Sequence, residues 1–445
     1  MRFTASQRLY ALGGVLLVAL IICAQSFSHR GAPSFLIPLA FAGVAYLLAV
    51  REFLFSANFP RRVVMFGLTM AALWNVVFMR VSPGADDDIH RYVWDGRVQR
   101  LGYNPYVLVP SDPAVAGLHT SETRGMNHPE LPSPYPPGAQ LFFRAITAIH
   151  ESVFAMKVAF VVCELAIVLL LLDFLRRTGR GEHWVLAFVW NPLLATEVAG
   201  SGHVDIVGVL LLLLSAVALV RRWRATAAVS FALAVAVKFL PIVLLPLYWK
   251  RARMRDGLLA AAIFGVLYAP FLNHGRIPLG SLGTYLQSFR FNGPVFAMLE
   301  RVLGPQVAAG LAILVGFSIA VWMRTRQPQS SLDLSAEAFA WPMAASLLCA
   351  PVVYPWYLLW LLPFMGSAST LPIIVWTVSI IPTYYVWHLR ALGRPWILSG
   401  WILLLEYGAI AAGGAIILLR TSGRPAVTKL ASDSAAPHCR GRGQS

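Results

Sequence analysis

The stretch Gly84-Ala85-Asp86-Asp87-Asp88-Ile89-His90-Arg91-Tyr92-Val93-Trp94-Asp95-Gly96-Arg97 places four carboxylates within ten residues. The chain around it is 58% hydrophobic and only 13% charged. Carboxylates are costly inside a bilayer, so this cluster must lie in water at a membrane surface. There it could transfer protons, or hold a cation and phosphates. The apolar segments on either side of this cluster therefore set the fold.

Those apolar segments alternate with basic clusters, which predicts an all-α, polytopic integral membrane protein. The mean hydropathy is +0.66, and the runs between clusters are long enough to cross a bilayer. The net charge is +16, but the basic residues punctuate the apolar runs instead of forming one basic face, which argues against nucleic acid as a partner. The four cysteines are scattered without metal-ligand spacing, which favours packing roles.

The charge pattern also predicts the topology. With the N-terminus inside, helices near 9–27, 35–50 and 63–81 leave residues 82–152 as a large loop outside the cytoplasm. The first run resembles a signal peptide, but the downstream charges are consistent only if it is a retained helix. Further spans are expected near 153–175, 184–200, 206–220, 225–249, 257–272, 306–323, 337–353, 357–369, 371–388 and 397–419. We therefore expect about 12 to 14 helices in one transmembrane domain, 1–420, followed by a disordered cytoplasmic tail, 421–445.

Segment 225–249 has basic clusters at both ends, which places both ends inside although the run resembles one span. A short helical hairpin broken at Lys238-Phe239-Leu240-Pro241 resolves this conflict, since proline disfavours a continuous helix. Lys238 then lies at the outer turn, where an intramembrane cation needs an anionic partner. A lipid phosphate is one candidate, and an internal pair with Glu164, Glu197 or Glu406 is the other. A single kinked helix is the alternative to the hairpin.

The acidic stretch itself is expected to form an interfacial helix that carries Asp88, Tyr92 and Asp95 on one face. A partly desolvated carboxylate beside aromatic rings has a raised pKa, which suits a general base. A solvated loop with chance acidic residues would look similar. The turns Gly102-Tyr103-Asn104-Pro105-Tyr106 and Tyr135-Pro136-Pro137-Gly138 indicate a rigid, shaped loop.

Three later outer segments hold further candidates. His203 and Asp205 follow Glu197 at a helix–helix turn, and a plain polar turn is the alternative. Arg290 is a second candidate phosphate ligand. Tyr354 and Trp356 are of the type that stacks on sugar faces, although aromatics at the membrane interface look the same.

These motifs together resemble the bacterial polyprenyl-phosphate-sugar-dependent glycosyltransferases of the GT-C superfamily, and most closely their α-mannosyltransferase-like branch. The resemblance rests on the first loop, from Asp87-Asp88-Ile89 through Asn104-Pro105-Tyr106 to Tyr135-Pro136-Pro137. It continues through Ser201-Gly202-His203-Val204-Asp205, Ala236-Val237-Lys238, Phe289-Arg290-Phe291-Asn292-Gly293 and Tyr354-Pro355-Trp356. More distantly, the Asp88 loop is similar to the first luminal loop of the GPI mannosyltransferase I catalytic subunit.

The resemblance implies transfer of a hexose, most simply mannose, from a polyprenyl-phosphate donor to a hydroxyl of a glycolipid or glycan acceptor. The reaction would take place outside the inner (plasma) membrane, with loop 82–152 as the catalytic loop. It implies an aspartate general base at Asp88, with the register between Asp87 and Asp88 open by one residue. Combined with the residue patterns above, it yields the substrate-binding candidates Tyr92, Asp95, Arg97, Asn104, Tyr106, Tyr135, His203, Asp205, Lys238, Arg290, Asn292, Tyr354 and Trp356.

Polyprenyl phosphate leaves without protonation, so one carboxylate can suffice for an inverting attack, and cationic Lys238 and Arg290 would stabilise the phosphate charge. We expect no cofactor, with a divalent cation between Asp87, Asp88 and phosphate as the alternative. A lipid or lipid-linked-sugar transporter would also have many helices, but its repeated halves are not evident. An acyltransferase or assembly scaffold is the third hypothesis.

Overall fold

The computed structural model describes residues 3–56, 59–84, 87–326 and 335–422. Within these ranges the regular structure is helical, and extended pairing is confined to two isolated bridges, Asn273 with Arg276 and Phe291 with Val352. The predicted all-α class is confirmed. Asp86 and nearly all of the predicted tail, 421–445, lie outside the described residues.

The α-helices in chain order are α1 (Ala5–Gln25), α2 (Pro33–Phe55), α3 (Arg61–Met79), α4 (Asp88–Arg100), α5 (Pro137–Ile149), α6 (Val153–Arg177), α7 (Val185–Val189), α8 (Pro192–Leu194), α9 (Asp205–Val220), α10 (Arg224–Val237), α11 (Met254–Tyr268), α12 (Leu282–Ser288), α13 (Pro294–Leu303), α14 (Pro305–Arg326), α15 (Glu337–Leu348), α16 (Leu371–Ser379), α17 (Tyr385–Ala391) and α18 (Gly400–Ser422). Short 3₁₀ or π segments complete the chain: η1 (Phe27–His29), η2 (Pro113–Leu118), η3 (Glu182–Trp184), η4 (Ala195–Gly200), η5 (Leu240–Tyr248), η6 (Ala269–Phe271), η7 (Pro355–Trp360), η8 (Leu362–Phe364), η9 (Ala368–Thr370) and η10 (Ile381–Tyr384).

In the described part of the chain, 8 helical segments are long and apolar enough to cross a membrane, or up to 9 if one bent pair counts as a span. The protein is therefore a multi-pass membrane protein. The expected 12 to 14 spans included apolar runs that the structure divides into shorter pieces, such as the 3₁₀ segments of 355–364. Proline at the first turn of several pieces explains the division, because its fixed φ suits a helix start but interrupts a preceding helix.

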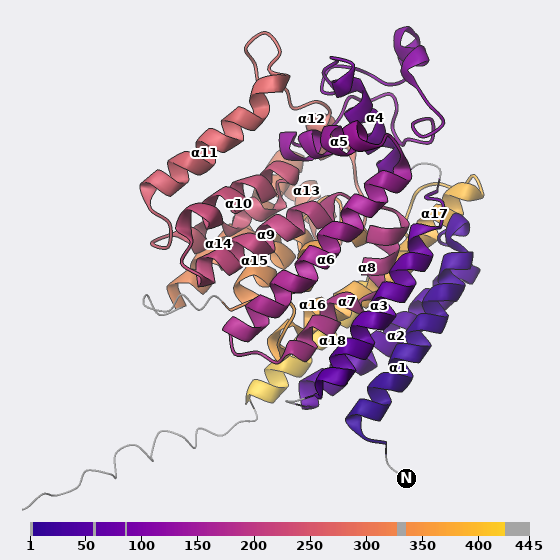
Figure 1. Ribbon diagram of the computed structural model, residues 1–445, viewed down its shortest axis with the longest axis vertical. Helices are drawn as coiled ribbons and strands as arrows, with labels where there is room; N and C mark the ends of the chain where they lie inside the picture. The colour runs from indigo at the N-terminus through magenta and orange to yellow at the C-terminus, as the bar shows by residue number, and fades with distance from the viewer. Residues whose placement is uncertain (1–2, 57–58, 85–86, 327–334, 423–445) are drawn as a thin grey trace, which may run out of the picture.

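The elements that carry the candidate residues gather at one end of the helix bundle. Figure 1 shows α4 and α5 lying across the upper end, with α1, α2 and α3 side by side along one flank and α11 apart on the other. Gly96 permits the α4–α5 crossing, since a Cβ there would lie 2.5 Å from the Phe143 carbonyl oxygen. The helix predicted over the acidic stretch is present as α4, and its place at the membrane interface stays a prediction.

Two breaks in apolar segments bring polar residues to this end. The pair formed by Pro192–Gly200 and Asp205–Val220 is bent by 119°. At the bend Gly202 has φ +76° and lies so close to Ile89 that a Cβ would be 2.4 Å from Ile89 Cδ1, so only glycine fits without strain. The second break is the predicted one: α10 ends at Val237 and Lys238 is extended, with φ −157° and ψ 141°. A single kinked helix through Lys238 is excluded.

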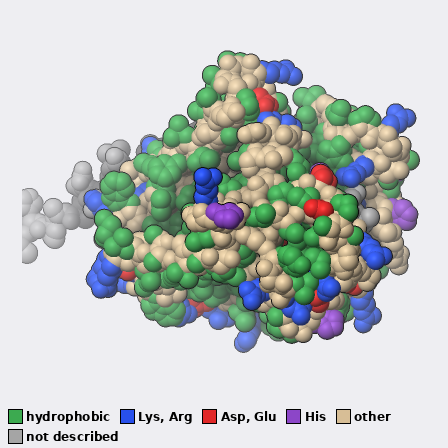
Figure 2. All heavy atoms as spheres, turned by 90° about the horizontal axis from the view of Figure 1, so that it is seen from above, with side chains coloured by type: hydrophobic (Ala, Val, Ile, Leu, Met, Phe, Trp, Pro, Cys, Tyr) green, Lys and Arg blue, Asp and Glu red, His purple; other side chains and the backbone are tan. Residues whose placement is uncertain are grey.

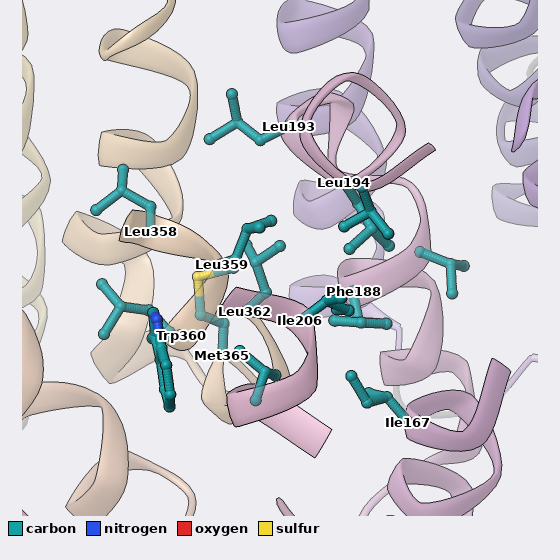
Figure 3. Packing of buried hydrophobic residues seen from close by; sticks show 14 of the residues in the cluster. Ile167, Phe188, Leu193, Leu194, Ile206, Leu358, Leu359, Trp360, Leu362 and Met365 are labelled. Carbon is teal, nitrogen blue, oxygen red and sulfur yellow. The ribbon is translucent and has the colours of Figure 1, made fainter. Parts of the chain in front are cut away.

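Below the breaks the bundle is held by close apolar packing. Leu193 and Leu194 of α8, Ile206 of α9 and Trp360 of η7 are almost fully buried in one core, and Figure 3 shows them beside Leu359, Leu362 and Met365. Broken segments pack in a lipid environment only where their freed backbone groups are enclosed by protein. This core therefore supports the two breaks that present the candidate site.

Candidate active site

A cavity of about 840 Å³ opens at the upper end of the bundle and collects most of the predicted residues. Its lining comes from α4, the loop after it, the two breaks, and segments near 281–290, 350–357 and 387–396. Ten predicted site residues line it: Asp87, Asp88, Tyr92, Tyr135, His203, Asp205, Lys238, Arg290, Tyr354 and Trp356. Seen from above, this face shows many hydrophobic side chains, scattered basic ones and few acidic ones (Figure 2). Of the site carboxylates, Asp87 and Asp205 are buried.

The adjacent carboxylates Asp87 and Asp88 have different partners. Asp87 is buried and forms an ion pair with the buried Arg30, whose Nη2 is 2.5 Å from Asp87 Oδ1. Arg30 Nη1 also donates to Ser201 Oγ at 2.7 Å, and the Gly84 amide donates to Asp87 Oδ2 at 2.9 Å. The negative charge of Asp87 is thus compensated by Arg30 and its side chain is held in place, which suits a structural role.

Asp88 keeps its charge available to the cavity. Its Oδ1 accepts a hydrogen bond from the Asn127 side-chain amide at 2.5 Å, and its Oδ2 lies 4.0 Å from His203 Nε2. Its side chain is 17% exposed, compared with 6% for Asp87. An amide donor orients a carboxylate without cancelling its charge. Of the two candidates, Asp88 is therefore arranged to accept a proton from a bound molecule.

Lys238 has an anionic partner, but not one of the glutamates considered from the sequence. Its Nζ lies 2.7 Å from Asp205 Oδ1 and 3.7 Å above the centre of the Tyr357 ring. The same Asp205 oxygen accepts a hydrogen bond from Trp360 Nε1 at 2.7 Å. Asp205 would consequently retain a donor if Lys238 turned toward a bound phosphate.

Arg290 lines the cavity with its donors engaged inside the protein. Its Nη2 lies 2.6 Å from the Glu300 carboxylate, and Nη1 donates to the carbonyl oxygens of Phe289 and Leu286 at 2.7 and 3.2 Å. The half-buried Glu300 carboxyl has a lowered pKa because of its hydrogen bond with Arg290. Of the two predicted cations, Lys238 is the one with the more easily exchanged partner.

The predicted aromatic residues form a column of stacked rings. His203 stacks on Trp356 with ring centroids 4.1 Å apart, Trp356 on Tyr354 at 4.4 Å, and Tyr354 on Phe291 at 4.6 Å. Both faces of Trp356 and of Tyr354 are therefore covered by protein rings. This geometry favours a role in holding His203 over the face-on sugar contact expected from the sequence.

Five predicted residues lie away from the cavity lining. Arg97 pairs with Glu151, with 2.6 Å between Nη1 and Oε1. Asn104 donates to the Phe271 carbonyl at 2.8 Å, and Tyr106 OH to the Tyr135 carbonyl at 2.7 Å. Asn292 Nδ2 lies 3.0 Å from Glu406 Oε1. The fifth is Asp95, on α4.

Asp95 is fully buried and lies about two helical turns after Asp88 on α4. Its Oδ2 accepts hydrogen bonds from Ser133 Oγ at 2.5 Å and Gln140 Nε2 at 2.9 Å, whereas its Oδ1 has no hydrogen-bond partner. Burial raises its pKa to about 6, against the opposing effects of Arg91 and the two donors. The three residues share one face of α4, as their spacing predicts, but Ser133 and Gln140 cover Asp95 and separate it from the cavity.

Several site residues escaped the sequence analysis. Arg30 lies between α1 and α2. The sequence holds one indication of its importance: it is an arginine in a loop predicted to lie outside the cytoplasm, where the positive-inside pattern disfavours basic residues. Asn127 begins the stretch Asn127-His128-Pro129-Glu130-Leu131-Pro132, which is part of the family resemblance, but nothing in the sequence marks it as the partner of Asp88. Trp387, Arg390 and Trp396 also line the cavity, but they come from a segment without a recognised motif.

A divalent cation between Asp87 and Asp88 has limited support from the donor set. Within the described residues, no group of three or more His, Cys, Asp or Glu side chains is arranged to hold a metal ion. Asp87 already has Arg30 as its countercharge. The cation alternative stays an untested prediction.

Comparison with known proteins now identifies the family. A family model described as "Alpha-(1->6)-mannopyranosyltransferase, N-terminal domain" matches residues 18–252. The chain belongs to this family. The match includes Asp88, His203 and Lys238, and it confirms the predicted class: the protein is a membrane glycosyltransferase. The aromatic column beyond His203 lies outside the matched residues.

Two further comparisons add context. A solved structure, described as "Crystal Structure of ArnT from Cupriavidus metallidurans bound to Undecaprenyl phosphate", is similar over 82% of this chain and 78% of that chain, with 15% sequence identity and a TM-score of 0.44. The search of curated proteins finds no match.

Proposed function

We propose that this glycosyltransferase transfers a hexose, most simply mannose, from a polyprenyl-phosphate donor to a hydroxyl of a lipid-linked or glycan acceptor. Asp88 acts as general base and the anomeric configuration inverts. The observation that carries this proposal is the contrast within the acidic run: Asp87 is neutralised by Arg30, whereas Asp88 faces the cavity with an amide partner. The family membership supports mannose as the sugar.

The chemistry requires one base and no acid. As the acceptor oxygen attacks the anomeric carbon, its O–H proton passes to Asp88. The bond between that carbon and the phosphate oxygen breaks, and its electron pair leaves with the polyprenyl phosphate. The phosphate gains negative charge at this step, and Lys238 would stabilise it after exchanging Asp205 for the phosphate. Arg290, which lines the same cavity, is assigned the same task.

A lipid-linked donor is supported by where the cavity wall meets the outer surface of the bundle. Ile313 of α14 lines the cavity and is also 52% exposed. Its helix is one of those suited to cross the membrane, and only 22% of its apolar window is buried by protein. An apolar residue that borders both cavity and lipid offers a lateral path for a polyprenyl chain while the sugar phosphate remains among the polar groups.

Helix direction supports a reaction on the outer side of the membrane. α3 begins at Arg61 and leads to the acidic run, and α10 begins at Arg224 and ends beside Lys238. α6 and α9 run the other way and bring Asp173 and Arg221 together at the far end, 2.8 Å apart. The basic clusters thus lie opposite the cavity, and by the positive-inside pattern the cavity and loop 82–152 face outward from the plasma membrane. Tail 421–445 would then be cytoplasmic.

The decisive experiment separates donor binding from turnover in Asp88→Asn and Asp87→Asn. Asn preserves the size of Asp88 but cannot take a proton, so we expect turnover to fall roughly 10²–10⁴-fold with donor binding nearly intact. Both quantities would be measured with a labelled polyprenyl-phosphate mannose in the same detergent. Near-normal turnover in Asp88→Asn together with a collapse in folded Asp87→Asn would assign the base to Asp87. Activity in both variants would remove this loop from the chemistry.

A further inference from the structure

The proton that Asp88 accepts must leave again before the next turnover, and the structure restricts its route. Asp88 Oδ1 is occupied by the Asn127 amide, which donates and cannot accept a proton there. The proton therefore resides on Oδ2, which faces His203 Nε2 at 4.0 Å. This distance exceeds a hydrogen bond, so a water molecule in the place vacated by product, or a small rotation of Asp88, would connect the two groups.

The His203 ring is held in one orientation, with Nδ1 engaged by Glu197 and Nε2 directed toward Asp88. Its side chain is only 2% exposed, and its plane is set by stacking on Trp356. Its Nδ1 lies 2.8 Å from the Glu197 carboxylate and makes its hydrogen bond to the Glu197 backbone carbonyl at 3.3 Å. A protonated Nδ1 leaves Nε2 as the proton acceptor in the neutral ring, and that atom faces Asp88.

Glu197 does not line the cavity, so the presence of a buried carboxylate at this position must have a reason other than contact with the substrate. It is fully buried in η4, and Tyr384 OH donates a hydrogen bond to its Oε1. A carboxylate in such a position favours the imidazolium form of a neighbouring histidine through opposite charge. The arrangement follows the general logic in which a carboxylate orients a histidine that exchanges protons with a reacting group.

We propose that His203 relays the proton from Asp88 to water and that Glu197, held by Tyr384, is the positioning residue that stabilises the imidazolium. The Asp88 O–H bond breaks and an Nε2–H bond forms, so His203 becomes a cation and Asp88 regains its negative charge. The imidazolium then loses this proton to water when the product leaves. This relay rests on the proposed function, because it presupposes Asp88 as the base.

Several charged and titratable groups surround the His203 ring. Asp88 at the start of α4, the preceding Asp87 and Glu197 of η4 act on it by their charge. Arg30 approaches through its hydrogen bond to Ser201, and Lys157 of α6 lies beside the neighbouring Gly202, where a Cβ would be 3.4 Å from Lys157 Cγ. Arg30 is already paired with Asp87, and Lys157 Nζ donates to the carbonyls of Val81 and Phe78 at 2.7 and 3.3 Å. The two cations thus have other partners. Among the carboxylates, Glu197 lies nearest to the ring, at 2.8 Å from Nδ1 compared with 4.0 Å between Asp88 and Nε2.

The first test is chemical rescue of His203→Ala in the full-length protein. We expect a loss of at least about 10²-fold in turnover, partly restored by free imidazole in proportion to its neutral fraction. Pyrazole, a ring of the same size and much weaker basicity, is the matched control and should not restore turnover. Equal restoration by both rings, or by neither, would overturn the relay and leave His203 a packing residue.

If His203→Ala does not yield folded protein, two variants at a distance from the cavity decide the question. Glu197→Gln removes the charge that favours imidazolium, so the acid limb of the pH–rate profile should move to lower pH by about one unit or more. Tyr384→Phe removes the hydrogen bond that Glu197 accepts, so the limb should move to higher pH. A limb that stays in place in both variants would contradict the relay.

The matched control for charge removal is Glu164→Gln. Glu164 is a second buried glutamate, bonded to Asn75 Nδ2 at 2.8 Å and absent from the cavity lining. The pH–rate profile of the Glu164→Gln variant should equal that of the unmodified protein. Failure of the relay is distinguishable from failure of the proposed function: if Asp88→Asn is inactive but the relay tests fail, only the relay is wrong, whereas an active Asp88→Asn refutes the base itself.

Discussion

The cavity has two walls that are held together by different forces. The acidic wall (Asp87, Asp88, Asn127, His203 and Asp205) depends on ion pairs and hydrogen bonds to specific partners, several of them buried. The aromatic wall (Tyr354, Trp356, Trp387 and Trp396) is held by ring contacts, including that of Tyr354 with Phe291 outside the cavity lining. Breaking a buried ion pair leaves an uncompensated charge, whereas a lost ring contact costs the contact alone.

This difference matters for function because the two walls meet at His203. The ring belongs to the acidic wall through Asp88 and Glu197, and to the stacked column through Trp356. The acidic wall comes from the part of the chain that matches the mannosyltransferase family, and the aromatic wall follows it in sequence. We therefore expect the acidic wall to tolerate few substitutions and the aromatic wall to respond in a graded way.

The largest expected effect is in the acidic wall, at Arg30→Met. The variant leaves Asp87 buried without a countercharge, which costs about 3–5 kcal/mol of unfolding free energy. The double variant Arg30→Met/Asp87→Asn removes both charges and should recover most of the loss. Unfolding in detergent is the measurement, with Arg176→Met as the control, since the Arg176–Glu182 pair is largely exposed. A single variant as stable as this control would contradict the contrast between the walls.

Next in size is the pH dependence of the buried Asp95 behind the acidic wall. Its pKa is raised to about 6 from 3.8, so the folded state holds its proton more tightly than the unfolded state. The stabilisation is complete below about pH 4 and is lost as pH rises to about 6, by up to about 3 kcal/mol. Asp95→Asn should remove this component, which hydrogen exchange of α4 and α5 at pH 5 and 8 would detect. An unchanged difference between the two pH values would exclude Asp95 as its source.

A smaller effect is expected at Lys238, where the acidic wall meets the donor. Lys238→Met should lower kcat/KM for the lipid-linked donor by roughly 10- to 100-fold, the value of a hydrogen bond to a charged group. Lys238→Arg should retain part of this activity, because it keeps the positive charge. Donor binding would be measured directly. If Lys238→Met binds the donor as tightly as the unmodified protein does, the lysine serves only its pair with Asp205.

The smallest effect is expected in the aromatic wall, at Tyr354→Leu. The substitution removes two stacked contacts of about 0.5–1.5 kcal/mol each while keeping an apolar side chain. Turnover should fall by roughly tenfold, through looser placement of His203, with donor affinity unchanged. Tyr10→Leu, which loses one ring contact with Phe66 far from the cavity lining, is the control for stability. A loss of donor affinity instead would indicate that Tyr354 contacts the sugar.

Much of the fold was predictable because its signals are local. Apolar run length and flanking charge located the helices, and the proline after Lys238 located the break at the end of α10. Asp88 and Tyr92 could be placed on one face of α4 from helical spacing alone. The same spacing could not show that Asp95 is closed off from the cavity, since Ser133 and Gln140, which cover it, lie 38 and 45 positions away in the sequence.

The order of residues along the chain was sufficient for the membrane class, the family, the acidic loop and the identity of most cavity residues. It could not assign partners, because ion pairs such as Arg30 with Asp87 and Lys238 with Asp205 join segments separated by 57 and 33 residues. Two features depend on atoms that meet only when the helices pack. One is which of the two adjacent aspartates has its charge compensated by an arginine, and the other is which ring faces are covered. Electrostatic and stacking energies fall off over a few ångströms, so these choices belong to the folded molecule.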